Sequence, residues 1–337
     1  MAHGSAPASA INLHNTEDVP LLIRALTASE PEEAYSAWRR WYRRADIDRL
    51  PWEYWQIIPA LGESLQTWLR DDPAAGIFQG VVRRAWTEAQ LRMTAARSAI
   101  DSIEQNGCAP VLLAGPAIVS LLNRRKGSVR PVSILCLVVH RDQLSQAAGA
   151  LESTGWKLSG ELPSLEALDW MNCVFFSRNE IGLLLHWRLL SINGPLASAC
   201  EAEFLAHHQS VTCCGRHALI PAPEHALLVA LSERMKPDPD LVPWQVDAAL
   251  LPLDTISWPK WTALAAAYAP EAFDRLDEMR SLGFDVPKLT RPPAPKPASA
   301  APASRPASAA PARLQRYKRL YRSLRHRAGR LVRRYRH

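Results

Sequence analysis

A short segment with three histidines and two cysteines has the residue types of a metal site. His207 and His208 are adjacent, Cys213 and Cys214 are adjacent, and His217 follows. Zinc is bound by imidazole nitrogens and thiolate sulfurs, and strong zinc motifs repeat these ligands in spaced pairs. The histidines of this segment form no i,i+3 or i,i+4 pair with one another, and the segment has no second cysteine pair. We therefore predict no metal site from this segment.

The end of the chain has a different chemistry, because residues 313–337 combine many cations with regularly spaced apolar side chains. Leucine, tyrosine and alanine recur there every three or four residues, which predicts a helix with one apolar stripe. Such a helix could lie on anionic lipid, bind nucleic-acid phosphates, or dock on an acidic protein surface, including the rest of this chain. The residues expected to bind an anionic surface are Arg313, Arg316, Lys318, Arg319, Arg322, Arg325, Arg327, Arg330, Arg333, Arg334 and Arg336.

The net charge of +7 is divided unequally along the chain. No Asp or Glu follows Asp285, whereas 15 of the 40 Lys and Arg residues do. The part up to Asp285 therefore holds 25 basic and 33 acidic residues, a net charge of −8. The two parts are expected to attract different partners, and to attract each other.

The elements that position these residues follow from the spacing of apolar side chains. Helical spacing predicts a helical leader over residues 1–106 and a helical C-terminal part over residues 195–287. Between them, residues 107–194 alternate short apolar runs with turn residues, which predicts a small mixed sheet flanked by helices. Residues 288–312 are rich in Pro and Ala and predict a disordered linker before the basic helix of residues 313–337. The expected fold class is α+β.

Within the central part, strands are expected at Pro110–Leu113, Val132–Val139, Asn172–Phe176 and Gly182–Trp187. The sequence RNEIG between the last two supplies hairpin turn residues. Helices are expected over residues 116–123 and 144–153, so the predicted order is strand, helix, strand, helix, strand, strand.

Several segments carry a resemblance to a known family. They are AWRRW at residues 37–41, VLLAGPA at 111–117, VRPVSILCLVV at 129–139, LLLHW at 183–187 and WQVDAALLPLDTISW at 244–258. In this order the chain, over about residues 20–287, resembles the bacterial uncharacterised nucleotidyltransferase family. That family is part of the nucleotidyltransferase-fold superfamily that includes polymerase-beta-like enzymes. The resemblance implies a glycine turn at residues 111–117, a metal-binding strand at 129–139 and a following strand at 183–187.

The resemblance also implies a chemistry that this sequence does not support. Such enzymes attack the alpha phosphate of a nucleotide with the help of two magnesium ions, which are held by acidic residues at i and i+2 of one strand and a third on a neighbouring strand. The family pattern places these acids at Ile134, Cys136 and Leu184, and a helper lysine at Ala114. A thiol and aliphatic side chains do not hold magnesium. We therefore expect no catalytic residue, no bound metal and no cofactor.

What remains of the implied pocket is a tentative ligand site formed by Gly115, Arg130, His186 and Trp187. Gly115 begins a predicted helix, and the first backbone amides of a helix can bind an anion. Alternatively, Gly115 is only a turn residue and His186 only a hydrogen-bonded strand residue.

The location expected for this protein is the cytoplasm. The first residues lack a basic segment followed by an apolar run, and the longest apolar runs are too short to span a bilayer. The six cysteines are scattered without a CxxC pair, so we expect them to be reduced and mostly buried. The basic end adds the alternative of a peripheral position at the inner face of the membrane.

Together these observations predict a catalytically degenerate nucleotidyltransferase-fold protein that acts as a binding or scaffolding partner in a bacterial biosynthetic or regulatory system. Its partner is expected to be a protein or an anionic membrane surface that meets the basic end, with nucleic acid as an alternative, and nucleotide binding is not expected. A second hypothesis is an active nucleotidyltransferase with displaced acids that modifies a small molecule, peptide or glycan. A third is a membrane-surface or nucleic-acid adaptor that acts through the basic end.

Overall fold

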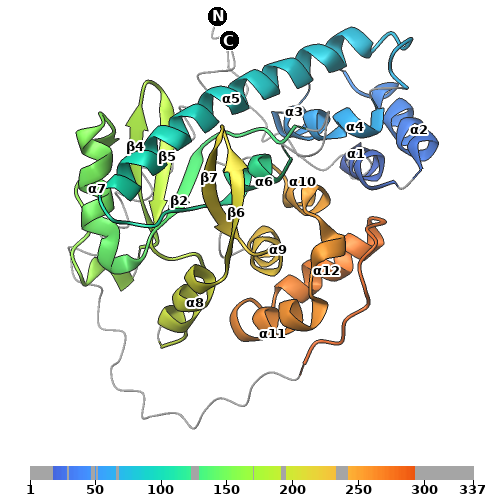
Figure 1. Cartoon of the computed structure of the whole chain (residues 1–337). Helices are drawn as coiled ribbons and strands as arrows, with labels where there is room; N and C mark the ends of the chain where they lie inside the picture. Colours follow the sequence, from blue (N-terminus) through green and yellow to red (C-terminus); the bar gives the residue numbers. More distant parts are fainter. Residues whose placement is uncertain are drawn as a thin grey trace, which may run out of the picture.

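The computed structural model of the chain, drawn in Figure 1, describes residues 18–28, 30–46, 50, 52–65, 68–122, 129–169, 171–190, 195–232 and 242–292. The predicted basic helix of residues 313–337, with all eleven of its Lys and Arg residues, lies outside the described residues. The predicted linker also lies outside them from residue 293 onward.

The N-terminal part is helical, as the spacing of its apolar residues predicts. The second helix shows why such segments form, because Pro31 starts it, Glu32 and Glu33 lie in its first turn and Arg39 and Arg40 in its last. These charges complement the helix dipole, and proline is compatible with the first helical turn. The helices are α1 (Asp18–Thr27), α2 (Pro31–Tyr42), α3 (Trp52–Ile57), the 3-10 helix η2 (Ile58–Leu61), α4 (Gly62–Leu65) and α5 (Ala75–Gln105).

The central part forms a mixed sheet. Its strands are β1 (Val111–Leu112), β2 (Leu135–Val138), β3 (Lys157–Leu158), β4 (Cys173–Arg178), β5 (Ile181–His186), β6 (His208–Cys213) and β7 (Arg216–Pro221). Within the described residues the strand order is β3-β4-β5-β2-β1-β7-β6. The pairs β2–β5 and β1–β7 are parallel, and the other neighbouring pairs are antiparallel. This sheet and its helices confirm the expected α+β fold class.

Most elements expected between residues 107 and 194 are present. Helix α6 (Ala114–Leu122) follows β1, and helix α7 (Leu144–Ser153) follows β2 after the short turn η3 (Arg141–Gln143). Between β4 and β5, Asn179 and Glu180 have positive φ angles of 47° and 65°. Two consecutive positive φ angles are typical of the tight turn that matches strand twist in a hairpin. The hairpin predicted from RNEIG is therefore confirmed.

The sheet also extends into the region for which only helices are expected. The β6–β7 hairpin lies between residues 208 and 221, and β7 pairs with β1 at the centre of the molecule. Its turn contains Cys214 and Gly215, with φ angles of 49° and 78°. The expectation of helix alone over residues 195–287 is corrected for this segment. Its two strands are half exposed and contain many polar residues, so their apolar pattern is weaker than the helical spacing around it.

The rest of the C-terminal part is helical. Its helices are α8 (Pro195–Ala206), α9 (Pro223–Leu231), α10 (Trp244–Leu250), α11 (Trp258–Tyr268) and α12 (Ala272–Ser281), with the short turn η6 (Leu253–Thr255) before α11. A similar short turn of the central part, η4 (Ala167–Asp169), precedes β4. After α12, Leu289 packs against the apolar core and Arg291 lies 3.8 Å from Asp274 of α12. Residues 288–292 thus follow the surface of the helical part.

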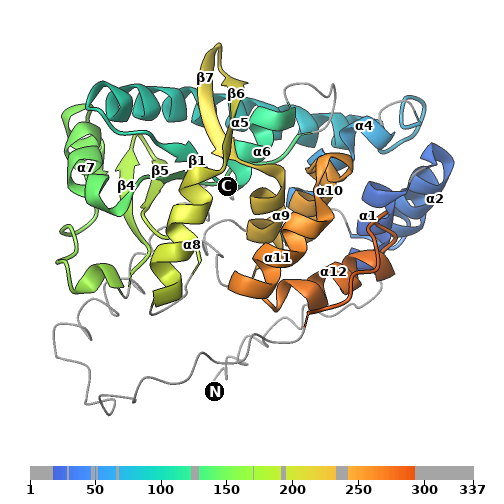
Figure 2. The same cartoon turned by 60° about the horizontal axis from the view of Figure 1, so that its bottom comes forward.

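Two apolar cores lie on the two faces of the sheet. Alternate side chains of β5 point into different cores, because Leu184 belongs to one core and Leu183 and Leu185 belong to the other. Figures 1 and 2 show α5 running from α4 past the sheet to α7. This helix contributes Phe78 to the first core and Ile103 to the second, so it joins the helical leader to the sheet.

Candidate functional site

The three positions implied to bind metal face the same apolar core. Cys136 of β2 is paired directly with Leu184 of β5, and Ile134 lies two residues before Cys136. All three side chains are buried in the same apolar core, with exposed fractions of 2% for Ile134, 0% for Cys136 and 7% for Leu184. The backbone therefore places positions 134 and 136 beside position 184, as the family's three metal ligands would require. The side chains at these positions are apolar and enclosed.

Gly115 and Arg130 are brought into direct contact. Gly115 is the second residue of α6, after Ala114 with its positive φ angle of 49°. A Cβ atom added to Gly115 would lie 2.5 Å from Nη1 of Arg130 and 3.0 Å from its Cζ. The absence of a side chain at Gly115 thus allows the guanidinium to lie against the start of α6, where an anion would approach the backbone amides.

The charge of Arg130 is balanced inside the protein. Nε and Nη2 of Arg130 donate hydrogen bonds of 2.8 and 3.0 Å to the two carboxylate oxygens of Asp247 in α10. Nη1 also donates to the carbonyl oxygen of Pro131. The Arg130 side chain is 1% exposed. Arginine and carboxylate in this two-bond arrangement form one of the stronger pairs in proteins, so the site that could hold an anion already holds Asp247.

His186 and Trp187 project to opposite faces of β5, as consecutive strand residues do. Trp187 belongs to the core on the far side of the sheet from Leu184, and its Nε1 donates to the carbonyl oxygen of Leu168 at 3.1 Å. His186 is 1% exposed, and within the described residues neither ring nitrogen has a hydrogen-bond partner. Burial lowers the pKa of His186 to about 4. The nearby backbone of Arg188 acts in the opposite direction, but it does not form a hydrogen bond with the ring. His186 is therefore held neutral.

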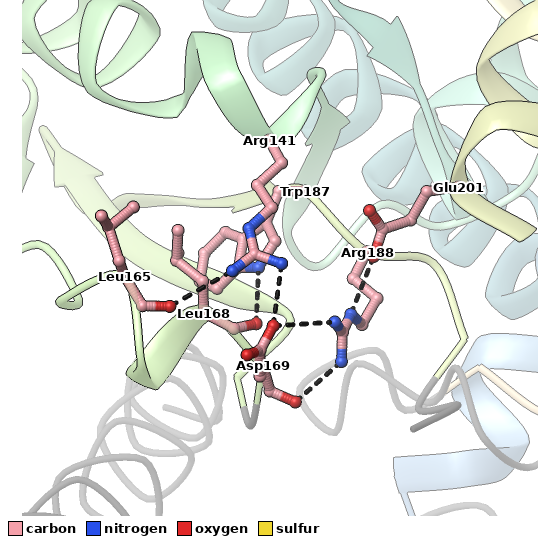
Figure 3. A network of polar contacts seen from close by, with 7 residues as sticks. All are labelled: Arg141, Leu165, Leu168, Asp169, Trp187, Arg188 and Glu201. Carbon is pink, nitrogen blue, oxygen red and sulfur yellow. Dashed lines mark hydrogen bonds and ion pairs between the residues drawn. The ribbon is translucent and has the colours of Figure 1, made fainter. Parts of the chain in front are cut away.

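A network of charged residues next to Trp187, with Arg188 buried at its centre, was missed by the sequence analysis (Figure 3). Arg188 is 6% exposed, and its Nε donates to Glu201 of α8 at 2.8 Å while its Nη1 donates to the carbonyl oxygen of Asp169 at 2.8 Å. Arg141 donates to the Asp169 carboxylate at 2.8 Å. The signal was an arginine inside an apolar run, since such a residue is buried only with partners. The network joins the end of β5 to α8 and to η4.

A second cluster that the sequence did not identify contains Glu203, His207 and His225. One ligand atom of each residue lies within 4.8 Å of the others, and this is the one such group of three within the described residues. His208 is exposed on β6, and Cys213 is buried on the same strand. The signal in the sequence was the i,i+4 spacing of Glu203 and His207. The third residue, His225, comes from another helix, α9.

The cysteines are free thiols, and five of the six are buried, as expected. Burial raises the pKa of Cys173 and of Cys200 to about 12 and that of Cys213 to about 11. These thiols are protonated at neutral pH, so they act as small apolar side chains rather than as nucleophiles. No helix in the described ranges is both long and apolar enough to cross a membrane.

Comparisons with known proteins identify one family and one similar solved structure. Residues 56–252 match the model of a family described as "Uncharacterised nucleotidyltransferase". A solved structure of the antibiotic-resistance factor ANT(2'')-Ia is similar, with 14% identity and a TM-score of 0.37 over 57% of this chain and 97% of that one. No curated protein matches the sequence.

Proposed function

The chain belongs to the uncharacterised nucleotidyltransferase family, and from this premise we propose that it is a catalytically inactive member that works as a binding or scaffolding partner. One observation carries the proposal. The positions where the fold would place magnesium ligands hold Ile134, Cys136 and Leu184, all buried in the apolar core. Magnesium requires oxygen ligands in a nearly octahedral arrangement, and none of these side chains offers one.

The consequence for catalysis follows from charge. In nucleotidyl transfer, two metal ions neutralise the attacking and leaving oxygens. Without them the triphosphate would meet buried aliphatic side chains, and desolvating its charge there is strongly unfavourable. The side chains of Cys136 and Leu184 thus pack in the apolar core and are not suited to binding a metal ion.

The Arg130–Asp247 pair supports the same proposal from the neighbouring helix. In an active pocket, a free arginine at the start of α6 would attract phosphate. Here Arg130 already binds the Asp247 carboxylate through two hydrogen bonds. A phosphate would have to compete with this pair, and separating it would leave a carboxylate without its buried partner.

In this proposal the role of the protein is recognition. The acidic part of the chain, up to Asp285, supplies a scaffold. The basic residues 313–337 supply the contact to a partner protein or an anionic membrane surface on the cytoplasmic side. A bacterial biosynthetic or regulatory system is the setting that this role fits best.

Calorimetric titration of the full-length protein with each nucleoside triphosphate, in magnesium and then in EDTA, tests the loss of activity. We expect no affinity gain from magnesium, because no carboxylate is contributed by β2 or β5. Release of pyrophosphate during prolonged incubation should remain at the background of a protein-free sample.

An affinity gain of about tenfold or more with magnesium, equivalent to about 1.4 kcal/mol, would overturn the proposal in favour of displaced acids. So would pyrophosphate release that increases with protein concentration. The same titrations on the Glu203→Gln variant serve as a control, since they separate a nucleotide-linked magnesium effect from metal binding at the Glu203 cluster.

A further inference from the structure

The cluster of Glu203, His207 and His225 lies where two helices meet and has no part in the proposed function. Glu203 is in the last turn of α8, His207 directly follows that helix, and His225 is in the first turn of α9. The β6–β7 hairpin separates His207 from His225 in sequence. The hairpin therefore brings the two helix ends back together.

The distances within the cluster suit a small divalent cation. The Glu203 oxygen Oε1 lies 3.0 Å from Nδ1 of His207 and 3.2 Å from Nε2 of His225. Ligand atoms on a tetrahedral zinc ion, at bond lengths of about 2.0 to 2.1 Å, are about 3.3 to 3.4 Å apart. The three residues could therefore converge on zinc with only small movements of their side chains.

The exposure of the residues suits the same ion. The side chains of Glu203 and His207 are 27% and 42% exposed, which leaves an approach from solvent and room for a water ligand.

The residues around the cluster hold the His225 ring in place and offset a nearby positive charge. Packing of Phe204 edge-on against the His225 ring, at a centroid distance of 4.7 Å, fixes that ring, whose Nδ1 has no partner among the described residues. The positive charge of Lys260 acts on His225, and Lys260 lies 3.9 Å from the carboxylate of Glu224. The Glu224 carboxylate offsets the ammonium charge that would otherwise oppose a metal ion.

We propose that Glu203, His207 and His225 bind one zinc ion, with water as the fourth ligand, and that the ion fastens the end of α8 to the start of α9. One carboxylate, two imidazoles and an open fourth position form a ligand set that zinc commonly takes in proteins. The opposing hypothesis is that the three residues form only a hydrogen-bonded ion pair.

The test compares zinc binding of the full chain and of single-residue variants, after removal of metal with a chelator. Native mass spectrometry and calorimetry with zinc chloride should show one ion fewer per chain in Glu203→Gln and in His207→Ala than in the unmodified protein. The adjacent, exposed His208→Ala is the matched control and should retain the full number. Zinc should raise the Tm of the unmodified protein and of His208→Ala, but not that of Glu203→Gln.

Both test variants are mild, because Glu203→Gln keeps the shape of the side chain and His207 is partly exposed. Circular dichroism should confirm that they are folded. Cobalt in place of zinc gives a second readout, since a tetrahedral site produces intense visible absorption that the two variants should lose. Equal zinc stoichiometry in all variants, or loss only in His208→Ala, would overturn the proposal.

Discussion

The position of the Arg130 side chain requires that residue 115 has no side chain. The guanidinium of Arg130 occupies the volume that a side chain at Gly115 would need, and Asp247 and the Pro131 carbonyl hold it there. Because the charged end is buried and bound on two sides, it cannot move away as an exposed arginine would. The requirement for glycine at this position is therefore one of space.

Replacing Gly115 with alanine should destabilise the protein by about 1 to 3 kcal/mol, the usual cost of forcing atoms into a packed site. Chemical denaturation would measure the change. Gly149 of α7 is the matched control, because nothing lies within 4 Å of an added Cβ there. Gly149→Ala should instead stabilise the protein by about 0.5 to 1 kcal/mol, as alanine does in helices. A neutral effect at Gly115 would mean that Arg130 relaxes freely.

His186 is the other residue whose environment has a measurable consequence. Its folded-state pKa is about 4, below its ordinary value of 6.5, because the ring is buried. Between these values the unfolded chain binds more protons than the folded one. The free energy of unfolding should therefore fall as the pH decreases from about 6.5 to 4.

Changing His186 to leucine should remove the His186 contribution to this decline, which amounts to about 3 kcal/mol. Leucine should be tolerated, since neither ring nitrogen has a hydrogen-bond partner in the described ranges. Unfolding measured across this pH range would test the prediction. The exposed His140→Asn variant is the control and should keep the full decline. Identical pH profiles for the leucine variant and the unmodified protein would contradict it.

At the scale of elements, helix α10 is joined to the segment before β2 by one buried charged pair. Asp247 of α10 reaches Arg130, which lies shortly before β2 and 117 residues away in sequence. Val246 and Leu250 of the same helix are buried in the core beside it. The pair therefore fixes how the C-terminal helices meet the start of α6.

Replacing Asp247 with asparagine should cost about 3 to 5 kcal/mol, because it leaves the buried guanidinium without its counter-charge. A double variant with Arg130→Met and Asp247→Leu should lose less, since it buries no unpaired charge. Denaturant titration would compare the two. The exposed Asp277→Asn variant of α12, whose partner is Arg280, should change stability very little. A single variant no less stable than the double one would disprove the argument.

At the scale of the whole molecule, the division of charge is the dominant feature. A chain that ends at residue 292 keeps 27 basic and 33 acidic residues, a net charge of −6 in place of +7. The described body is therefore expected to be repelled by anionic surfaces, and residues 293–337 are expected to carry any attraction to them.

Truncation after residue 292 should abolish binding to anionic vesicles and to nucleic acid. Changing Leu314, Leu324 and Leu331 to serine keeps every arginine but removes about 1.5 to 3 kcal/mol for each leucine that inserts into lipid. Vesicle sedimentation should then show a large loss, and nucleic-acid binding only a small one. If the triple variant binds both as before but no longer binds a protein partner, the basic end is a protein-docking segment.

The sequence by itself determined the chemical character of the site and most of the central sheet. The residue types at 134, 136 and 184 rule out magnesium ligation wherever those residues lie, and the count of charges does not depend on the fold. The central strands and the RNEIG turn were predicted because their apolar runs and turn residues are local signals. The β6–β7 hairpin was missed because its half-exposed strands carry a weak local signal.

Only the tertiary structure decided which distant residues meet. Arg130 was predicted as part of a tentative ligand site, and its partner Asp247 lies 117 residues away. The Arg188 network and the meeting of Glu203 with His225 likewise join separate elements. The spacing of apolar residues shows which face of an element is buried, but it does not specify which other element covers that face. Charge pairing between distant residues depends on that packing, so it cannot be derived from local sequence.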